Sequence, residues 1–285
     1  MPTYKNYDIN QLRDYSSLFL RNEVNRWYKN DLSSMRSKID RYDKPLLQKK
    51  LSYLAYLRKV YRILERFYPN EYVYKNEFIT KWLLEEIGVA DSVVYSELRL
   101  GKAVADLAMF NGVSKVFEIK TLLDKEARLS NQLEQYQQLF NEIYLIVPEI
   151  KSQQYLKRDF STGVIGYDQN HHSFSLIRKA IHREGINVDV LMQVLHTHEY
   201  VTLVEQYLGE RPQFHDFNKF KICKELISQM PKEAVSKHFV ALIKARRSPN
   251  VFSKKESQLN QVFLSMNFTP SQKRQLISNL STIIC

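Results

Sequence analysis

The sequence has few of the residues that mark membrane, secreted or metal-cluster proteins. Its 285 residues include only two cysteines, Cys223 and Cys285, and none of its apolar runs reaches the ~20 residues of a membrane-spanning helix. Two cysteines exclude a disulfide framework and a four-cysteine zinc or iron–sulfur site. The polar N-terminal segment has no apolar stretch typical of a secretory signal. We expect a cytoplasmic globular protein that does not enter membranes, and the sequence leaves its oligomeric state open.

Positive charge is in excess and unevenly distributed. The formal net charge is +11, with +8 in residues 1–70, −2 in residues 71–180 and +5 in residues 181–285. A near-neutral centre between basic flanks suits a protein that binds a polyanion and carries out chemistry in its middle. A basic composition that only favours solubility is the alternative.

Patterning divides the chain into three segments. Helical apolar spacing dominates residues 1–69, where helices are expected at 10–29 and 46–68 with Pro45 at the start of the second. In the middle segment, 70–180, the pattern predicts a helix, three strands, a helix and a further strand, followed by two shorter strands; the segment 181–285 returns to basic helices. The expected elements of the middle segment are 71–87 (helix), 92–100, 103–110 and 114–120 (strands), 125–140 (helix), and 142–147, 163–167 and 173–178 (strands). This order indicates a mixed α/β core flanked by helical segments.

A basic stripe occurs on the second expected helix. Arg58, Arg62 and Arg66 recur every fourth residue and so share one face. Together with neighbouring tyrosines they could bind phosphates and bases. A solvated face over a packed aromatic core explains them equally well.

The residues that carry chemistry lie on the second and third expected strands. Side chains alternate along a strand, so Glu118 and Lys120 share a face while Ile119 points into the core. Two carboxylates, Asp106 and Glu118, from neighbouring strands offer the hard oxygen ligands that Mg²⁺ or Mn²⁺ prefers. Lys120 could hold or help deprotonate a water, or stabilise a charged phosphate. Glu97, on the first strand, is a further acidic candidate, for which a surface role is the alternative.

Context distinguishes this Glu-x-Lys from a second copy at Glu149-Ile150-Lys151. The second copy follows Pro148 and has no aspartate-bearing strand before it. The first follows the strand that carries Asp106. Any one of these side chains alone could instead be a packed or solvated surface group.

Three stretches together resemble the PD-(D/E)xK nuclease superfamily, in its RecB-type branch. They are LGKAVADLAMF (100–110), VFEIKT (116–121) and the helical segment from Gln132 to Tyr136, which reproduces a Gln-x-x-x-Tyr pattern. The resemblance covers roughly residues 70–148. It implies a restriction-endonuclease-like mixed sheet core that hydrolyses phosphodiester bonds, and it does not extend to the helical flanks.

The resemblance also implies roles for single residues. The metal ligands would be Asp106, Glu118 and the Ile119 carbonyl, with Lys120 as the catalytic lysine. Glu77, on the preceding helix, would act through water or a second ion, and Gln132 and Tyr136 would reach the site or bound DNA. Arg128 is a further candidate nucleic-acid contact, in addition to the three arginines of the basic stripe. Many relatives in that branch hold an iron–sulfur cluster on four cysteines, which this chain cannot form.

The hairpin between the second and third strands decides whether this site can exist. Directly opposed residues of an antiparallel pair point to one face. A two-residue Asn111-Gly112 turn would pair Asp106 with Phe117 and separate it from Glu118. A three-residue loop, 111–113, or a bulge would place Asp106 opposite Glu118, and Gly112 suits such a loop because one of its residues commonly has positive φ.

We therefore predict a Mg²⁺- or Mn²⁺-dependent nuclease acting on nucleic acid, with DNA as the expected substrate. The alternative is a module that binds nucleic acid or a partner and retains the fold without turnover.

Overall fold

The protein is described by a computed structural model that covers residues 7–87, 92–100, 103–124, 126–158, 160–246 and 252–284. The chain forms two compact units. The first, here called the helical unit, comprises residues 1–84 and 252–285, and the second, the sheet unit, comprises residues 85–251. None of the helices in the described ranges is long and apolar enough to cross a membrane.

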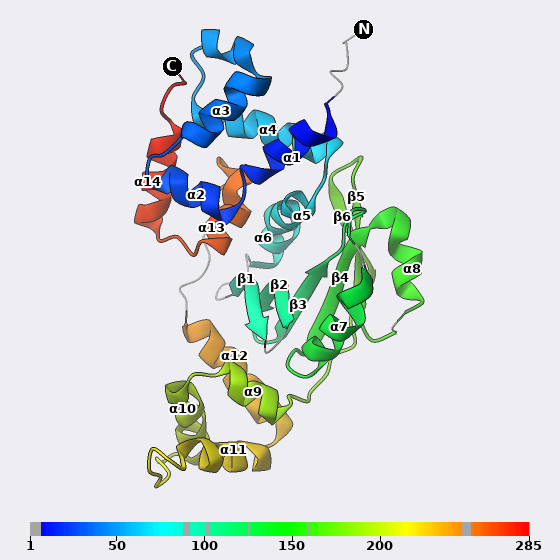
Figure 1. Ribbon diagram of the computed structural model, residues 1–285. Helices are drawn as coiled ribbons and strands as arrows, with labels where there is room; N and C mark the ends of the chain where they lie inside the picture. The colour runs from blue at the N-terminus through cyan, green and yellow to red at the C-terminus, as the bar shows by residue number, and fades with distance from the viewer. Residues whose placement is uncertain are drawn as a thin grey trace. The chain divides into compact units, whose positions relative to one another are not determined.

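The helical unit is built from both ends of the chain (Figure 1). Its elements are α1 (Ile9–Ser17), α2 (Arg21–Tyr28), α3 (Ser33–Tyr42), η1 (Lys44–Gln48), α4 (Tyr53–Phe67), α5 (Glu71–Phe78), the π-helix η2 (Ile79–Leu83), η5 (Ser257–Leu259), α13 (Asn260–Ser265) and α14 (Pro270–Leu280). Long-range hydrogen bonds join the two ends: Asn279 Nδ2 donates to the Trp27 carbonyl at 2.9 Å, and the Tyr72 hydroxyl donates to the Gln258 carbonyl at 2.7 Å. The last part of the third expected segment, residues 252–285, therefore joins the first segment in one unit, whereas residues 181–251 belong to the sheet unit.

The longest helix of this unit, α4, shows why its sequence is helical. Leu54, Leu57, Val60 and Leu64 recur at helical spacing and are all buried in one apolar core. Ser52 caps the helix by accepting a hydrogen bond from the Ala55 N–H at 3.2 Å. The expected start at Pro45 was wrong, because Pro45 lies in the short 3-10 helix η1.

The helices expected at 10–29 and 71–87 are both present, but each is divided into shorter helices. The helix expected at 10–29 is divided into α1 and α2 by a turn at 18–20, in which Leu18 and Phe19 are buried. The helix expected at 71–87 is present as α5, η2 and α6 (Leu84–Ile87), and Gly88, its expected end, lies outside the described residues.

The sheet unit contains a six-stranded mixed sheet with the strand order β1-β2-β3-β4-β5-β6. The strands are β1 (Val93–Leu100), β2 (Ala103–Phe110), β3 (Ser114–Ile119), β4 (Glu142–Pro148), β5 (Gly163–Asp168) and β6 (Ser173–Arg178). Strands β3, β4 and β5 run parallel, and the other neighbouring pairs are antiparallel. All six strands were predicted from the sequence to within two residues, and the mixed α/β class is confirmed.

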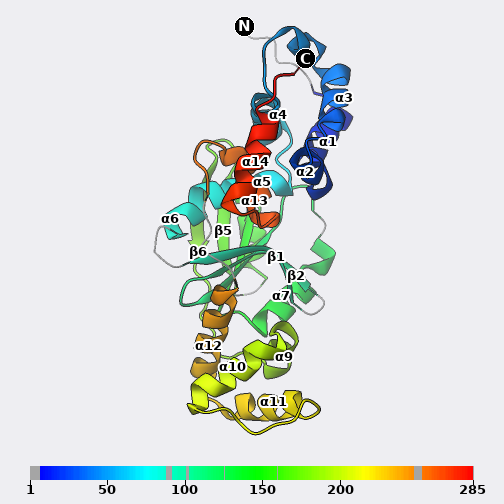
Figure 2. The same cartoon turned by 90° about the vertical axis from the view of Figure 1, so that its left-hand side faces the viewer.

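Helices cover one face of this sheet. The crossovers are η3 (Glu126–Arg128) with α7 (Leu129–Gln137), and η4 (Glu149–Lys151) with α8 (Ser152–Leu156); the last helices are α9 (Val188–Val194), α10 (Thr197–Leu208), α11 (Lys219–Gln229) and α12 (Lys232–Ala245). Residues of α7 and of α9–α12 share a core with Ala108, Phe110 and Val116 of β2 and β3. Figures 1 and 2 both show α9–α12 gathered at one end of this unit.

Candidate active site

The β2–β3 hairpin has the three-residue loop that the site requires. Phe110 pairs with Ser114, and Leu107 pairs with Phe117, so residues 111–113 form the loop. Gly112 has φ +91°, a conformation that L-residues rarely adopt. The same register, continued by one residue, places Asp106 opposite Glu118. The prediction of a three-residue loop is confirmed.

The hairpin fixes the position of Asp106 through the backbone of β3. Asp106 Oδ2 accepts a hydrogen bond from the Ile119 N–H at 2.8 Å. Ile119 itself is 2% exposed, and alternation places its side chain on the opposite face from Glu118. The Asp106 carboxylate is half-buried on the same face as Ala108 and Val116, which belong to the core beneath α7.

Glu118 is the more enclosed of the two carboxylates. It is 2% exposed, its Oε1 accepts from Lys120 Nζ at 2.7 Å, and its Oε2 accepts from the Tyr136 hydroxyl at 2.7 Å. Burial and then the negative charge of Asp106 raise the pKa of Glu118 to about 7, although Lys120 and Tyr136 act in the opposite direction. The two carboxylates therefore repel each other, and a cation between them would relieve that repulsion.

Helix α7 holds the other side of the site. Tyr136 is fully buried, and its hydroxyl also lies 3.0 Å from the Val104 carbonyl oxygen. Burial and the Glu118 charge raise the pKa of Tyr136. The hydroxyl therefore stays protonated and can donate a hydrogen bond to these acceptors. Gln132, one turn earlier, accepts from Lys120 Nζ at 3.3 Å. The structure thus brings together Asp106, Glu118, Ile119, Lys120, Gln132 and Tyr136.

A small loop after β3 was not predicted from the sequence. The N–H and the hydroxyl of Thr121 both donate to Asp124 Oδ2, at 2.7 and 2.8 Å. Thr121 is 2% exposed, so this loop fixes the chain directly after Lys120. The Thr-x-x-Asp spacing was a signal for it, because such side chains commonly bond to backbone groups within a turn.

Glu97 lies in line with the two carboxylates but in an unusual backbone conformation. The pairs Ser96–Leu107 and Leu98–Ala105 place it opposite Asp106 on β1. Its φ is +57° and its side chain is exposed. A non-glycine residue in this region typically costs ~1–2 kcal/mol.

The described residues contain no group of three or more His, Cys, Asp or Glu side chains close enough to hold a metal ion.

Of the remaining candidates, Glu77 and the three α4 arginines belong to the helical unit, and Arg128 belongs to the sheet unit. Glu77 belongs to the helical unit, where its carboxylate accepts from the Tyr61 hydroxyl at 2.6 Å and pairs with Lys81 at 2.7 Å. Arg58, Arg62 and Arg66 line the outer side of α4 in the same unit, half-buried or exposed. Arg128 is exposed in the sheet unit, at the N-terminus of α7.

The fold and the site together define a mixed α/β protein in which two carboxylates and a lysine share one sheet face beside a buried tyrosine. The chain belongs to the family described as Bacteriophage P4 protein cII, whose model matches residues 65–265. This match includes the whole sheet unit described above.

Two individual proteins are similar to parts of the chain. Protein cII of Enterobacteria phage P4 is 27% identical over 134 residues, which cover 45% of this chain and 51% of that protein. The match therefore spans about half the length of that relative. A solved structure of a protein of unknown function from Silicibacter pomeroyi aligns with 45% of this chain and 89% of its own, at 15% identity and a TM-score of 0.30. A TM-score this low does not establish a common fold.

Proposed function

We propose that the sheet unit hydrolyses phosphodiester bonds of DNA with the help of Mg²⁺ or Mn²⁺. The observation that carries this proposal is the β2–β3 register, which puts Asp106 on the face of Glu118 and Lys120. The order α5/α6, β1, β2, β3, α7, β4 also follows the core expected for a restriction-endonuclease-like nuclease. The two further strands and α9–α12 would be additions to that core.

The side chains of the site fit a hard divalent cation. Asp106 and Glu118 supply oxygen ligands. Burial and, after it, the charge of Asp106 raise the pKa of Glu118, and a bound cation would relieve the repulsion between the two carboxylates. Mg²⁺ is commonly held by one or two carboxylates, with waters and substrate phosphates completing its shell. The Ile119 carbonyl would be a third protein ligand. When bound, the cation would neutralise charge on the phosphate and favour a hydroxide-like water.

The other residues would position and stabilise the reacting groups. Lys120 Nζ contacts both Glu118 and Gln132, so it is held at the edge of the carboxylate pair, where it would stabilise negative charge on the scissile phosphate. Tyr136 keeps one Glu118 oxygen fixed from the core side. Tyr136 and Gln132 are therefore positioning residues in this proposal, and Lys120 is the catalytic lysine.

The distribution of charge supports a polyanionic substrate. The helical unit holds 21 Lys and Arg against 10 Asp and Glu, whereas the sheet unit holds 21 against 21. The net charge of +11 thus belongs entirely to the helical unit. We propose that this unit binds the phosphate backbone, with Arg58, Arg62 and Arg66 among its contacts, and that Arg128 contacts it from the sheet unit.

The proposal is tested by incubating the full chain with linear, circular, single-stranded and branched DNA, and with RNA, with and without Mg²⁺ or Mn²⁺. We expect cleavage of at least one DNA substrate that requires the metal and stops with EDTA. DNA binding without any cleavage would favour the alternative, a binding module that retains the fold. If the protein neither binds nor cleaves any of these nucleic acids, the assignment to nucleic acid is wrong.

A further inference from the structure

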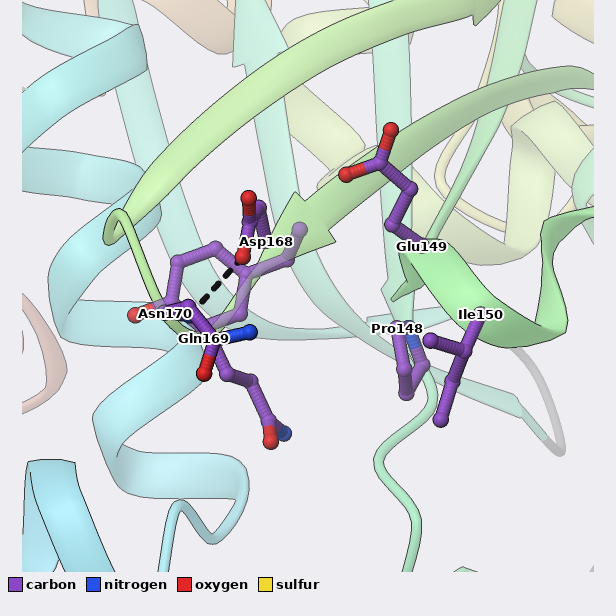
Figure 3. A pocket seen from close by; sticks show the side chains of 7 residues that line it. Pro148, Glu149, Ile150, Asp168, Gln169 and Asn170 are labelled. Atoms are coloured by element: carbon purple, nitrogen blue, oxygen red, sulfur yellow. Dashed lines mark hydrogen bonds between the residues drawn. The ribbon is translucent and has the colours of Figure 1, made fainter.

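A cavity opens at the edge of the sheet where β3, β4 and β5 end, the edge at which Lys120 also lies. It has a volume of about 380 Å³ and is lined by Pro148, Glu149, Ile150, Tyr167, Asp168, Gln169 and Asn170 (Figure 3). Because β3, β4 and β5 are parallel, the residues that follow each of them meet at one edge. Neighbouring strands lie ~4.8 Å apart, so β5 is ~10 Å from the strand that carries Glu118.

The walls of this cavity are preformed. Asp168 Oδ1 accepts from the Asn170 N–H at 2.8 Å, and Asp168 Oδ2 lies 2.5 Å from His171 Nδ1, which locks the turn between β5 and β6. The ring of Tyr167 stacks on Phe174 at 4.6 Å between centroids. Figure 3 shows Gln169 and Asn170 on one side and Pro148 and Ile150 on the other. Ile150 is 83% exposed, so it gives the cavity an apolar wall that a ligand could contact.

The polar groups of the lining select the chemistry of that ligand. Two of the seven lining residues, Glu149 and Asp168, are acidic, and none of the seven is basic. A phosphate would be repelled there. A flat, uncharged ring with hydrogen-bond donors would be accepted, because its faces contact Pro148 and Ile150 while a carboxylate and an amide receive its donors.

We propose that this cavity binds a nucleobase that carries an exocyclic amine, that is adenine, cytosine or guanine. Glu149 accepts from the amine and Asn170 contacts the base edge, as carboxylates and amides do in base recognition. This inference rests on the proposed nuclease function, for which it would supply a base preference close to the cleaved bond. Thymine and uracil lack the amine and offer only the ring N3–H, which is flanked by two carbonyl oxygens that the Glu149 carboxylate repels.

The test measures binding of free nucleosides to the full-length protein by ligand-observed NMR. Adenosine, cytidine, guanosine and thymidine are compared on the wild type, Glu149→Gln, Asn170→Ala, Ile150→Ser and the matched control Glu225→Gln, an exposed glutamate on α11. We expect thymidine to bind at least about 10-fold more weakly than the best amine-bearing nucleoside, and each pocket variant to reduce that difference. The control should not change it.

The result separates this inference from the proposed function. Equal binding of all four nucleosides, no binding, or a preference unchanged in the pocket variants would overturn the base pocket even if the protein cuts DNA. A selective nucleoside signal that the three variants abolish would support the pocket even if no cleavage is found. Inorganic phosphate is added as a competitor, and displacement of the nucleoside by phosphate would also count against the pocket.

Discussion

At the scale of single residues, the site depends on a buried carboxylate with a full set of partners. Glu118 is 2% exposed and receives hydrogen bonds on both oxygens, from Lys120 and from Tyr136. A buried carboxylate is tolerated only when its lone pairs are satisfied. Removing either partner should therefore cost stability as well as activity.

Tyr136→Phe tests this dependence. The variant keeps the ring but leaves Glu118 Oε2 and the Val104 carbonyl without the hydroxyl. We expect a loss of ~1–3 kcal/mol in the free energy of unfolding, measured by urea denaturation, and slower cleavage. Tyr207→Phe, at a tyrosine that is 42% exposed on α10, is the control and should change neither. An unchanged stability for Tyr136→Phe would mean that Glu118 does not depend on this hydroxyl.

A second buried carboxylate, Asp43 of the helical unit, gives a pH-dependent prediction. It is 3% exposed and accepts from Lys59 Nζ at 2.6 Å, the Tyr15 hydroxyl at 2.6 Å and the Tyr56 hydroxyl at 3.1 Å. Burial alone would raise its pKa, but these hydrogen bonds outweigh burial and lower the pKa below its ordinary value. Its stabilising contribution is therefore present above the unfolded pKa of ~3.9 and is lost as the pH falls through the lower, folded pKa.

Asp43→Asn should accordingly destabilise the protein at neutral pH and much less in acid. We expect a loss of about 2 kcal/mol at pH ~7, allowing for the partly exposed Lys59, and a smaller loss near pH ~3. Urea midpoints measured from pH ~7 to ~3 check this. Asp40→Asn, whose partner Arg36 forms an exposed pair, is the control with a change near zero. A loss for Asp43→Asn that is constant with pH would be inconsistent with this account.

At the scale of elements, the hairpin from β2 to β3 is decisive. Asn111 and Gly112 are strong turn signals, but they do not fix the loop length. The three-residue loop was expected because a two-residue turn would separate Asp106 from Glu118, with a bulge as the alternative. The six strands could be predicted because their apolar runs are short and separated by Gly, Pro or Asn. The start of the second helix was not predicted: Pro45 was expected to begin it, whereas α4 begins after its N-cap residue Ser52.

Gly112→Ala tests the hairpin. Alanine at φ +91° should cost ~1–2 kcal/mol in the free energy of unfolding, since nothing lies close enough to clash and the strain is conformational. We also expect reduced cleavage, because a strained loop shifts Asp106 relative to Glu118. Gly185→Ala is the matched control: its φ is not positive and its nearest neighbour, Lys232, would be 3.8 Å from the new Cβ. Equal stability of the two variants would argue against a left-handed Gly112.

At the scale of the whole molecule, the sequence showed basic flanks around a near-neutral centre, but not that the two ends of the chain form one basic unit. The basic excess is spread over residues 1–84 and 252–285, which are far apart along the chain. They become one unit through contacts such as Asn279 with Trp27 and an isolated bridge between Ser52 and Ile283. Such long-range pairing leaves no local pattern. Glu77, which the sequence analysis grouped with residues 70–180, belongs to the helical unit by its contacts.

The charge of the helical unit predicts the salt dependence of DNA binding. Replacing Arg58, Arg62 and Arg66 by Ala should weaken binding and flatten the plot of log affinity against log salt. The slope should fall by up to ~0.9 for each duplex phosphate that is no longer neutralised, or ~0.7 for single strands. The control removes three exposed lysines of the neutral sheet unit, Lys157, Lys221 and Lys232. Similar slopes in both triple variants would mean that the arginine stripe is only a solvated face.

The central claim is that Asp106, Glu118 and Lys120 form one catalytic centre. The most direct test is the single-turnover rate of DNA cleavage with Mg²⁺ or Mn²⁺ for the wild type, Asp106→Asn, Glu118→Gln, Lys120→Met and the control Glu134→Gln, an exposed glutamate on α7. Circular dichroism establishes that each variant is folded. We predict that the control cleaves at the wild-type rate and that each of the other three falls by at least about 100-fold. A folded Glu118→Gln protein that cleaves at the wild-type rate would contradict the account.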